Sequence, residues 1–177
     1  EIEESIAMEQ PIISGVSQDL SEAKITVTAV PDRPGEAALV FETLADLGVN
    51  LDMIVQNVSA DGSTDITFTL PTADLGAASA ALLGRQEEIG FGELLQDEGI
   101  AKVSLVGAGM RSHPGVSATF FRTLADAGVN VEMISTSEIR ISVVTRAEDA
   151  AKAVQALHSS FGLDADGEAV VYAGTGR

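Results

Sequence analysis

The feature that most constrains the fold of this 177-residue chain is an internal repeat. Residues 34–54 align with residues 114–134 at a constant offset of 80, and 13 of the 21 positions are identical. Further along, residues 65–68 match residues 140–143 at an offset of 75, so the first copy has a loop five residues longer. The extra residues fall within the turn-rich stretch 59–63, where an insertion costs little. We therefore predict two similar modules in tandem.

The two copies share one order of predicted elements. Apolar residues that alternate with Thr or Ser predict a strand with one buried face. Pro-Gly then starts a helix, because Pro at the first turn loses no hydrogen bond, and a Gly ends it. Two strands, a second helix and a last strand follow. In the first copy the strands are expected at 24–30, 51–58, 64–70 and 93–96, and the helices at 34–48 and 72–88. In the second copy the strands are expected at 102–106, 131–136, 139–145 and 169–172, and the helices at 114–128 and 147–161.

The order βαββαβ is that of the split-βαβ, or ferredoxin-like, module. The predicted fold class is therefore α+β, with two tandem ferredoxin-like βαββαβ modules whose sheets are antiparallel. Residues 12–18 look like an extra leading strand. We assign residues 1–11 to a linker, residues 12–97 to the first module with that strand, and residues 98–177 to the second. Whether the modules form one sheet with a partner chain or exchange their terminal segments stays open.

Composition excludes several classes of function. The chain has 10 Lys and Arg against 27 Asp and Glu, a net charge of −17, so no basic face exists to neutralise the phosphates of a nucleic acid or an anionic membrane. It has no Cys for a disulfide or a zinc–thiolate site, and its two His, His113 and His158, are too far apart for a histidine metal cluster. No apolar run approaches the roughly 20 residues of a membrane span. We expect a cytoplasmic protein with no nucleic-acid, membrane or metal partner.

The sequence offers no convincing set of catalytic residues. Its carboxylates are scattered along helices and tails, which is typical of a solvated surface. Gly107-Ala108-Gly109 lacks the third Gly and the Lys-Ser/Thr of a phosphate-binding loop, and nothing resembles a nucleophile elbow. We predict that the chain is not an enzyme by itself and uses no cofactor.

The loops before the first helix of each copy, residues 31–35 and 111–115, favour ligand binding instead. A helix N-terminus offers free N–H groups and a positive dipole end, which suits a carboxylate. A nearby carboxylate such as Asp32 suits an ammonium group, and together they describe a site for a free amino acid. Pro-Gly is also simply a good helix start, and Asp32 a common turn residue. The residues by themselves leave both interpretations open.

Several strings resemble a known family. Pro34-Gly35 with Gly48-Val49-Asn50, repeated in the second copy, resembles the ACT domain, an amino-acid-sensing module of metabolic enzymes. Longer strings resemble the C-terminal regulatory region of aspartate kinases, and they are residues 56–59, 102–110, 112–115, 134–142 and 173–177. The resemblance covers residues 12–177, and Ser-Thr-Ser-Glu-Ile-Arg-Ile-Ser at 135–142 is its most specific part.

This resemblance implies feedback control of the first step toward lysine, threonine and methionine. In the family a separate amino-terminal domain phosphorylates aspartate with ATP, and nothing in this sequence matches that domain. The chain would therefore be catalytically silent, form a homodimer through its ACT domains and act on a catalytic aspartate kinase chain. Residues 1–7 would belong to the linker of a larger chain or to an added segment.

The resemblance also implies two effector pockets shared between chains. The first, for threonine, would use Asp32, Gly35, Ala37 and Gln56 with Asn130 and Val131 of a partner chain. The second, for lysine where a member binds it, would use His113, Pro114, Gly115, Val116, Ser117, Ser137 and Glu138 with Asn50 and Asp52 of a partner chain. The second copy lacks an acid equivalent to Asp32, since Met110-Arg111-Ser112 occupies that place, and Glu138 is the expected substitute.

Two other functions are compatible with parts of the sequence. One is a stand-alone amino-acid-sensing module that regulates another enzyme or pathway, although no basic segment supports direct DNA control. The other is a small ferredoxin-like enzyme. It would need a group of reactive side chains that meet at one site, and we find no such group in the sequence.

Overall fold

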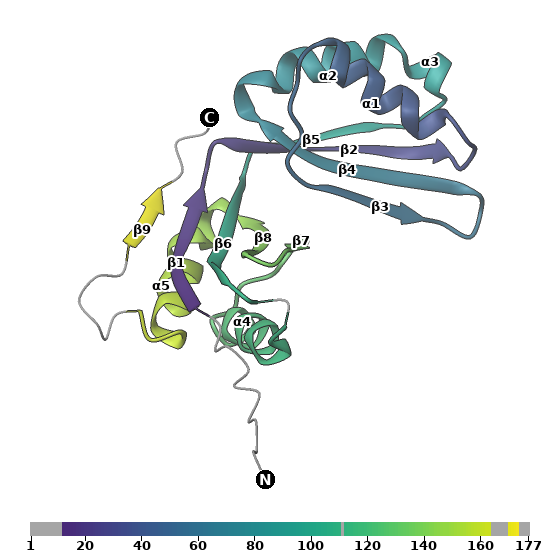
Figure 1. The fold of residues 1–177 in the computed structure, drawn as a ribbon. Coiled ribbons are helices and arrows are strands. Elements are labelled where there is room, and N and C mark those ends of the chain that lie inside the picture. The colour runs from purple at the N-terminus through teal and green to yellow at the C-terminus, as the bar shows by residue number, and fades with distance from the viewer. Residues whose placement is uncertain (1–11, 111, 164–169, 174–177) are drawn as a thin grey trace. The chain divides into compact units, whose positions relative to one another are not determined.

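A computed structural model describes residues 12–110, 112–163 and 170–173 and divides the chain into two compact units. Residues 19–101 form one unit, called here the first module. The described residues before 19 and after 101 form the other, called here the second module. The first module is thus an insertion between two segments of the second (Figure 1).

The first module is a four-stranded sheet covered by helices. The strand order is β3-β4-β2-β5, and each neighbouring pair is antiparallel. The strands are β2 (Glu22–Pro31), β3 (Ile54–Val58), β4 (Ser63–Pro71) and β5 (Leu94–Asp97). The helices are α1 (Glu36–Asp46), α2 (Leu75–Gly84) and the short α3 (Gln86–Ile89), with a 3-10 turn at Thr72–Asp74. All three helices lie on the same side of the sheet in Figure 1.

The core of the first module lies between this sheet and its helices. Along β2, Ile25 and Val27 are fully buried, whereas Thr26 between them is half-buried, as the alternating pattern predicts. Phe68 of β4 is also fully buried, and the Phe41 ring of α1 meets it edge to face at 6.5 Å between centroids. The ferredoxin-like arrangement predicted for the first copy is confirmed.

The second module contains a five-stranded sheet of order β7-β8-β6-β1-β9. Its strands are β1 (Ile12–Asp19), β6 (Ile100–Ala108), β7 (Met133–Thr136), β8 (Arg140–Arg146) and β9 (Val170–Ala173). Its helices are α4 (Pro114–Asp126) and α5 (Ala150–Ser160), with a 3-10 turn at Ala147–Asp149. Phe120 of α4 and Leu157 of α5 are fully buried, as are Leu105 and Val143 on the central strands.

Strand β1 changes the predicted domain organisation. It lies between β6 and β9, and it pairs with β9 in parallel, with Gly15 opposite Val170. The assignment of residues 12–18 to the first module is therefore wrong, and the second sheet includes the parallel pair β1–β9 beside antiparallel pairing such as that of β7 with β8. A strand that precedes both copies carries the same alternating pattern whichever sheet receives it. The predicted linker at 1–11 lies outside the described residues.

The glycines predicted to end the first helix of each copy do so by the same geometry. Gly48 and Gly128 have φ values of 70° and 75°, in the left-handed region. The Gly48 N–H donates to Ala45 and the Val49 N–H donates to Leu44, at 2.9 and 3.1 Å. The equivalent bonds follow α4, so both helices end in a Schellman motif.

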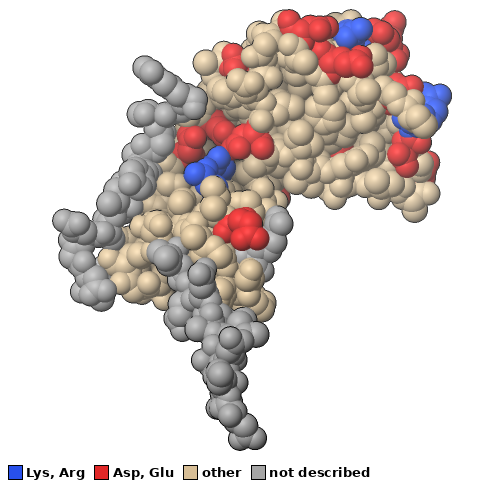
Figure 2. Space-filling view, viewed as in Figure 1, with Lys and Arg blue, Asp and Glu red and all other residues tan. Residues whose placement is uncertain are grey.

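The surface of the first module is acidic. Figure 2 shows carboxylates gathered over its helical layer, with a few basic groups among them. Ion pairs such as Arg33–Glu36 at 3.3 Å and Arg85–Glu88 at 3.0 Å are partly exposed, so they contribute little to stability. No helix in the described ranges is long and apolar enough to span a membrane.

Candidate functional site

In the first module the predicted ligand loop connects β2 to α1. Helix α1 begins at Glu36, and Gly35 precedes it with φ 94° and ψ −20°. The Gly35 carbonyl oxygen accepts the Leu39 N–H at 3.1 Å. The prediction that Pro34-Gly35 forms the first helical turn is wrong for this copy, because the left-handed Gly35 turns the chain before the helix starts.

Asp32 is exposed, but its backbone is held. Its N–H donates to the Gly62 carbonyl oxygen at 2.9 Å, in the turn between β3 and β4. Asp61 shapes this turn by accepting the Ser63 hydroxyl at 2.7 Å and the Ser63 N–H at 3.0 Å. These two hydrogen bonds, the hydroxyl first, hold the pKa of Asp61 below its usual value. The five-residue extension of the first copy is therefore the segment that holds the Asp32 backbone.

The other residues predicted for the first pocket lie in two modules. Ala37, in the first turn of α1, packs partly against the core, and Gln56 is exposed on the edge strand β3. Asn130 and Val131 belong to the second module, in the segment between α4 and β7. Because the prediction takes these two from a partner chain, the complete pocket stays a prediction.

In the second module Pro114-Gly115 does form the first turn of a helix, as predicted. Pro114 is the first residue of α4, and His113 precedes it with φ −127° and ψ 85°. The His113 side chain lies with Nδ1 2.7 Å from the Gly109 carbonyl oxygen. Because a carbonyl only accepts, Nδ1 carries the proton in this contact. The His113 carbonyl oxygen accepts the Val116 N–H at 3.0 Å and closes the first turn.

The turn between β7 and β8 lies against the loop that leads to α4. The Met110 N–H donates to the Glu138 carbonyl oxygen at 3.1 Å, and the Gly107 N–H donates to the Ile139 carbonyl oxygen at 2.9 Å. Within the turn, the Ser137 N–H donates to Arg140 at 2.8 Å. These bonds hold the turn that contains the predicted residues Ser137 and Glu138 against the loop that leads to α4.

A cavity of about 290 Å³ opens at this junction. Its lining residues are Met110, Pro114, Ser117, Thr136, Ser137 and Ile141. The buried side chains of Met110 and Ile141 are apolar, and the three hydroxyl-bearing residues can donate or accept hydrogen bonds. An apolar surface with a few convergent polar groups is typical of a small-molecule site.

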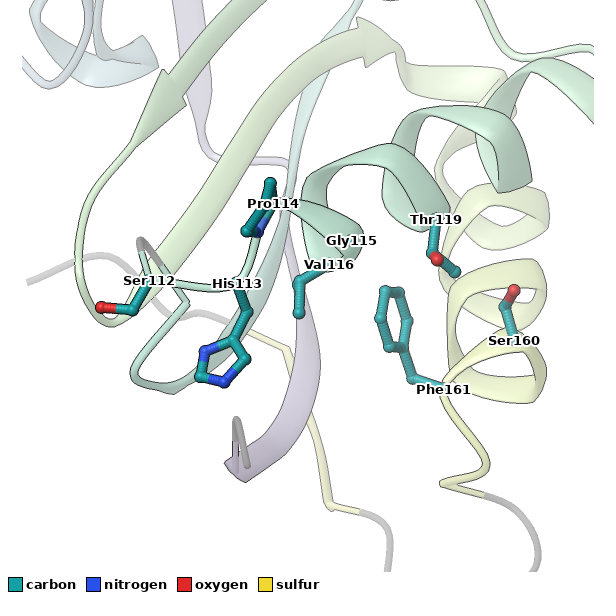
Figure 3. A pocket seen from close by; sticks show the side chains of 8 residues that line it. All are labelled: Ser112, His113, Pro114, Gly115, Val116, Thr119, Ser160 and Phe161. Atoms are coloured by element: carbon teal, nitrogen blue, oxygen red, sulfur yellow. The ribbon is translucent and has the colours of Figure 1, made fainter. Parts of the chain in front are cut away.

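A larger open cavity of about 680 Å³ is also lined by Pro114. Its lining residues are Ser112, His113, Pro114, Gly115, Val116, Thr119, Ser160 and Phe161. Figure 3 shows the Phe161 ring, from the end of α5, lying beside the first turns of α4 between Val116 and Thr119. The residues predicted for one second pocket thus divide between two cavities that share Pro114.

Three predicted residues of the second pocket line neither cavity. The Glu138 side chain is exposed, and what this residue contributes to the junction is its carbonyl oxygen. Asn50 and Asp52 are exposed in the first module between α1 and β3. The sequence predicts that these two residues complete the second pocket of a partner chain, and this stays a prediction.

Sequence reasoning missed the residues that form the walls of the cavities. Met110, Thr136 and Ile141 line the smaller one, and Thr119, Ser160 and Phe161 line the larger one. Met110 had a usable signal, because the strand alignment at an offset of 78 places it opposite Asp32. Both residues donate their N–H to the carbonyl of a following hairpin turn, which confirms that they are structurally equivalent.

Comparisons with known proteins define the class of protein. A family model described as the ACT domain matches residues 25–84 and 103–161, once in each module. The aspartokinase of Mycobacterium bovis (strain ATCC BAA-935 / AF2122/97) is 59% identical over 175 residues, which cover 97% of this chain and 41% of the relative. The chain therefore spans about two fifths of the length of the curated relatives it matches.

Two solved structures match with a TM-score of 0.80 and 43% identity. One, of aspartokinase alpha and beta subunits, is matched over 85% of this chain and 99% of that one. The other, the ligand-free regulatory subunit of aspartate kinase from Thermus thermophilus, is matched over 84% and 99%. The chain thus belongs to the aspartokinase family and corresponds to its regulatory part, which is built of two ACT domains.

Proposed function

We propose that this chain senses end-product amino acids, with threonine at the first pocket and lysine at the second, and so controls aspartate phosphorylation by feedback inhibition. The observation that supports an amino acid as the class of ligand is the 290 Å³ cavity at the second pocket, where the start of α4 meets the β7–β8 turn. The backbone N–H groups of a helix start suit the carboxylate of an amino acid. The hydroxyls of Ser117, Thr136 and Ser137 suit its polar groups.

The two pockets differ at the position that would meet the ligand's ammonium group. In the first module this position holds Asp32, and in the second it holds Met110, which is 2% exposed. A second-site ligand would therefore use another carboxylate, and the proposed one is that of Glu138, which is exposed. A more distant solved structure, 25% identical with a TM-score of 0.65, is E. coli aspartokinase III in complex with lysine and aspartate. It supports an amino acid as the class of ligand.

The proposed sensor works as a homodimer. Strands β3 and β7 are edge strands of their sheets. Ile54 and Ile134, equivalent residues of the repeat, are 54% and 51% exposed on them, and Val58 of β3 is 64% exposed. An unpaired strand edge with exposed apolar side chains is suited to pairing with another strand. Pairing β3 of one chain with β7 of its partner would bring Gln56 toward the partner subunit's Asn130 and Val131.

Catalysis belongs to the part of the relatives that this chain does not span. Binding that requires two chains stabilises the assembled form, because the ligand has no complete site on a free chain. The coupling to the catalytic part is then a shift of the equilibrium between active and inhibited states. The free energy of this shift is set by the difference between the ligand's affinities for the two states.

Isothermal titration of threonine and then lysine into this chain, with light scattering before and after, tests the proposal. Saturable threonine binding with a stabilised dimer is expected, and additional lysine heat would support the second site. A folded chain that binds neither would contradict the proposed effectors.

A further inference from the structure

Strand β2 is interrupted by a β-bulge immediately before the loop that carries Asp32. Its pairing with β4 runs regularly to Val27 opposite Ile66 and resumes at Val30 opposite Thr64. Two residues, Thr28 and Ala29, therefore lie opposite Asp65 alone. Ala29 has φ 52°, a left-handed conformation that a residue with a Cβ rarely adopts.

The bulge is held from both neighbouring segments. On one side the Asp65 carboxylate, through Oδ1, accepts the Ala29 N–H at 2.9 Å. On the other side the Thr28 carbonyl oxygen accepts the Gly92 N–H at 2.8 Å, and the Thr28 N–H donates to Glu93 at 2.9 Å. A strained backbone persists only where its surroundings determine it, and here both sides do.

The extra residue decides on which face of the sheet the following residues fall. Val27 and Val30 are both fully buried. On a regular strand, two side chains three residues apart would point to opposite faces of the sheet. The bulge thus returns the buried face of β2 to the core at Val30, two residues before Asp32. It therefore sets the register of the strand end that leads into the Asp32 loop.

The second module satisfies the same position by other means. Gly107 aligns with Ala29, and its N–H donates to the Ile139 carbonyl oxygen at 2.9 Å. Arg140 stands where the first module has Asp65. Both modules thus hold this N–H, but only the first does so with a side chain.

We propose that Asp65 is a positioning residue for the effector site: by holding the Ala29 N–H it fixes the bulge that places Asp32. The inference rests on the proposed function only in naming Asp32 as the residue that binds the ligand. Asp65 acts through the backbone and is not itself placed in contact with the ligand.

The test combines amide hydrogen exchange of the ligand-free chain with threonine titration. In Asp65→Ala, exchange at Ala29 and Asp32 should rise roughly tenfold, and threonine affinity should fall roughly fivefold. Asp65→Asn should recover much of both, because its amide oxygen still accepts. Adding Ala29→Gly to Asp65→Ala should also recover affinity, because Gly adopts a positive φ without strain.

Asp19→Ala is the matched control. Asp19 also accepts a backbone N–H, that of Ser21 at 2.7 Å, but at the other end of β2, so both readouts should stay as in the wild type. If Asp65→Ala does not fold, Gly92→Ala tests the bulge from the other side, since its Cβ would lie 3.2 Å from Thr28 Oγ1.

Unchanged exchange at Ala29 and Asp32 in the variant would overturn the inference whatever the ligand does. Raised exchange with unchanged threonine affinity would overturn the positioning role. A wild-type chain that binds no threonine would overturn the proposed effector instead. Raised exchange in the variant would then still support the bulge-holding role of Asp65.

Discussion

Asp32 and Met110 show how one position of the repeat serves two chemistries. Asp32 follows β2 and Met110 follows β6, the strand before the first helix of each module, and both donate their N–H to a hairpin turn, at 2.9 and 3.1 Å. Asp32 is exposed and ionisable, whereas Met110 is buried and lines the 290 Å³ cavity. The shared backbone contact is a property of the fold, and the side chain at this position distinguishes the proposed sites.

Asp32→Ala should weaken threonine binding by roughly tenfold or more, because a desolvated ammonium group loses its charged partner. Calorimetry of the chain measures the change directly. Asp46→Ala is the matched control, because it removes an equally exposed carboxylate at the far end of α1. If both variants bind threonine like the wild type, Asp32 does not belong to the site.

Ser137→Phe should relieve feedback inhibition of a reconstituted kinase, because the ring would occupy the smaller cavity that Ser137 lines. The measurement is aspartate phosphorylation against effector concentration. Ser137→Ala separates the two contributions of the residue, since it removes the hydroxyl and leaves the cavity open. Full inhibition in the Phe variant would contradict the placement of the second effector there.

At the scale of elements, the helix ends follow from local chemistry and the helix starts do not. Gly48 and Gly128 end their helices in the same motif, because each copy needs a residue with a positive φ there. The starts differ although Pro-Gly is present twice. Pro114-Gly115 lies inside α4, whereas Gly35 lies outside α1 with φ 94°. Thr72 also shows this, because Thr is a residue type that often caps a helix, yet its hydroxyl donates to the Ser21 carbonyl oxygen at 2.9 Å instead.

Gly48→Ala should lower the free energy of unfolding by about 1 kcal/mol, because Ala is disfavoured at positive φ. A Cβ there would meet nothing within 4 Å, so the cost is conformational and not steric. Gly76→Ala, inside α2 and equally free of neighbours, should instead stabilise by about 0.5–1 kcal/mol. Urea unfolding measures both, and equal signs for the two variants would contradict this explanation.

At the scale of the whole molecule, the second module is assembled from both ends of the described chain. Strand β1 reaches its sheet before the first module begins, and β6 returns to it afterwards. Folding of the second module therefore needs contacts that are distant in sequence, whereas the first module is continuous. This arrangement allows each module to be destabilised separately.

Val16→Ala should destabilise the second module by about 2 kcal/mol, because Val16 of β1 is fully buried. Hydrogen exchange should rise in β6 and β8 and stay unchanged in β2 and β4. Val27→Ala, equally buried in β2, should give the reverse pattern. Faster exchange in β4 of the Val16 variant would contradict the separation of the two cores.

Ile54→Lys should shift the proposed dimer toward monomer, because a charge on an edge strand opposes pairing with another strand. Light scattering as a function of concentration measures the shift. Leu83→Lys is the control, since Leu83 is 49% exposed on α2 and away from the edge strand. A dimer that is equally stable in Ile54→Lys would place the interface elsewhere.

By itself the sequence determined the two ferredoxin-like modules, their helices and the glycines that end α1 and α4. The physical reason is that hydrophobic periodicity and turn chemistry act over a few residues, and the repeat shows both patterns in each of its two copies. Only the tertiary structure decided that β1 joins the second sheet, that Gly35 lies outside its helix and that the predicted second pocket divides at Pro114. Two of these depend on which distant segments meet: β1 with β9, and the start of α4 with the β7–β8 turn. The alternating pattern of a strand and the preference of Pro-Gly for a helix start do not specify such a partner.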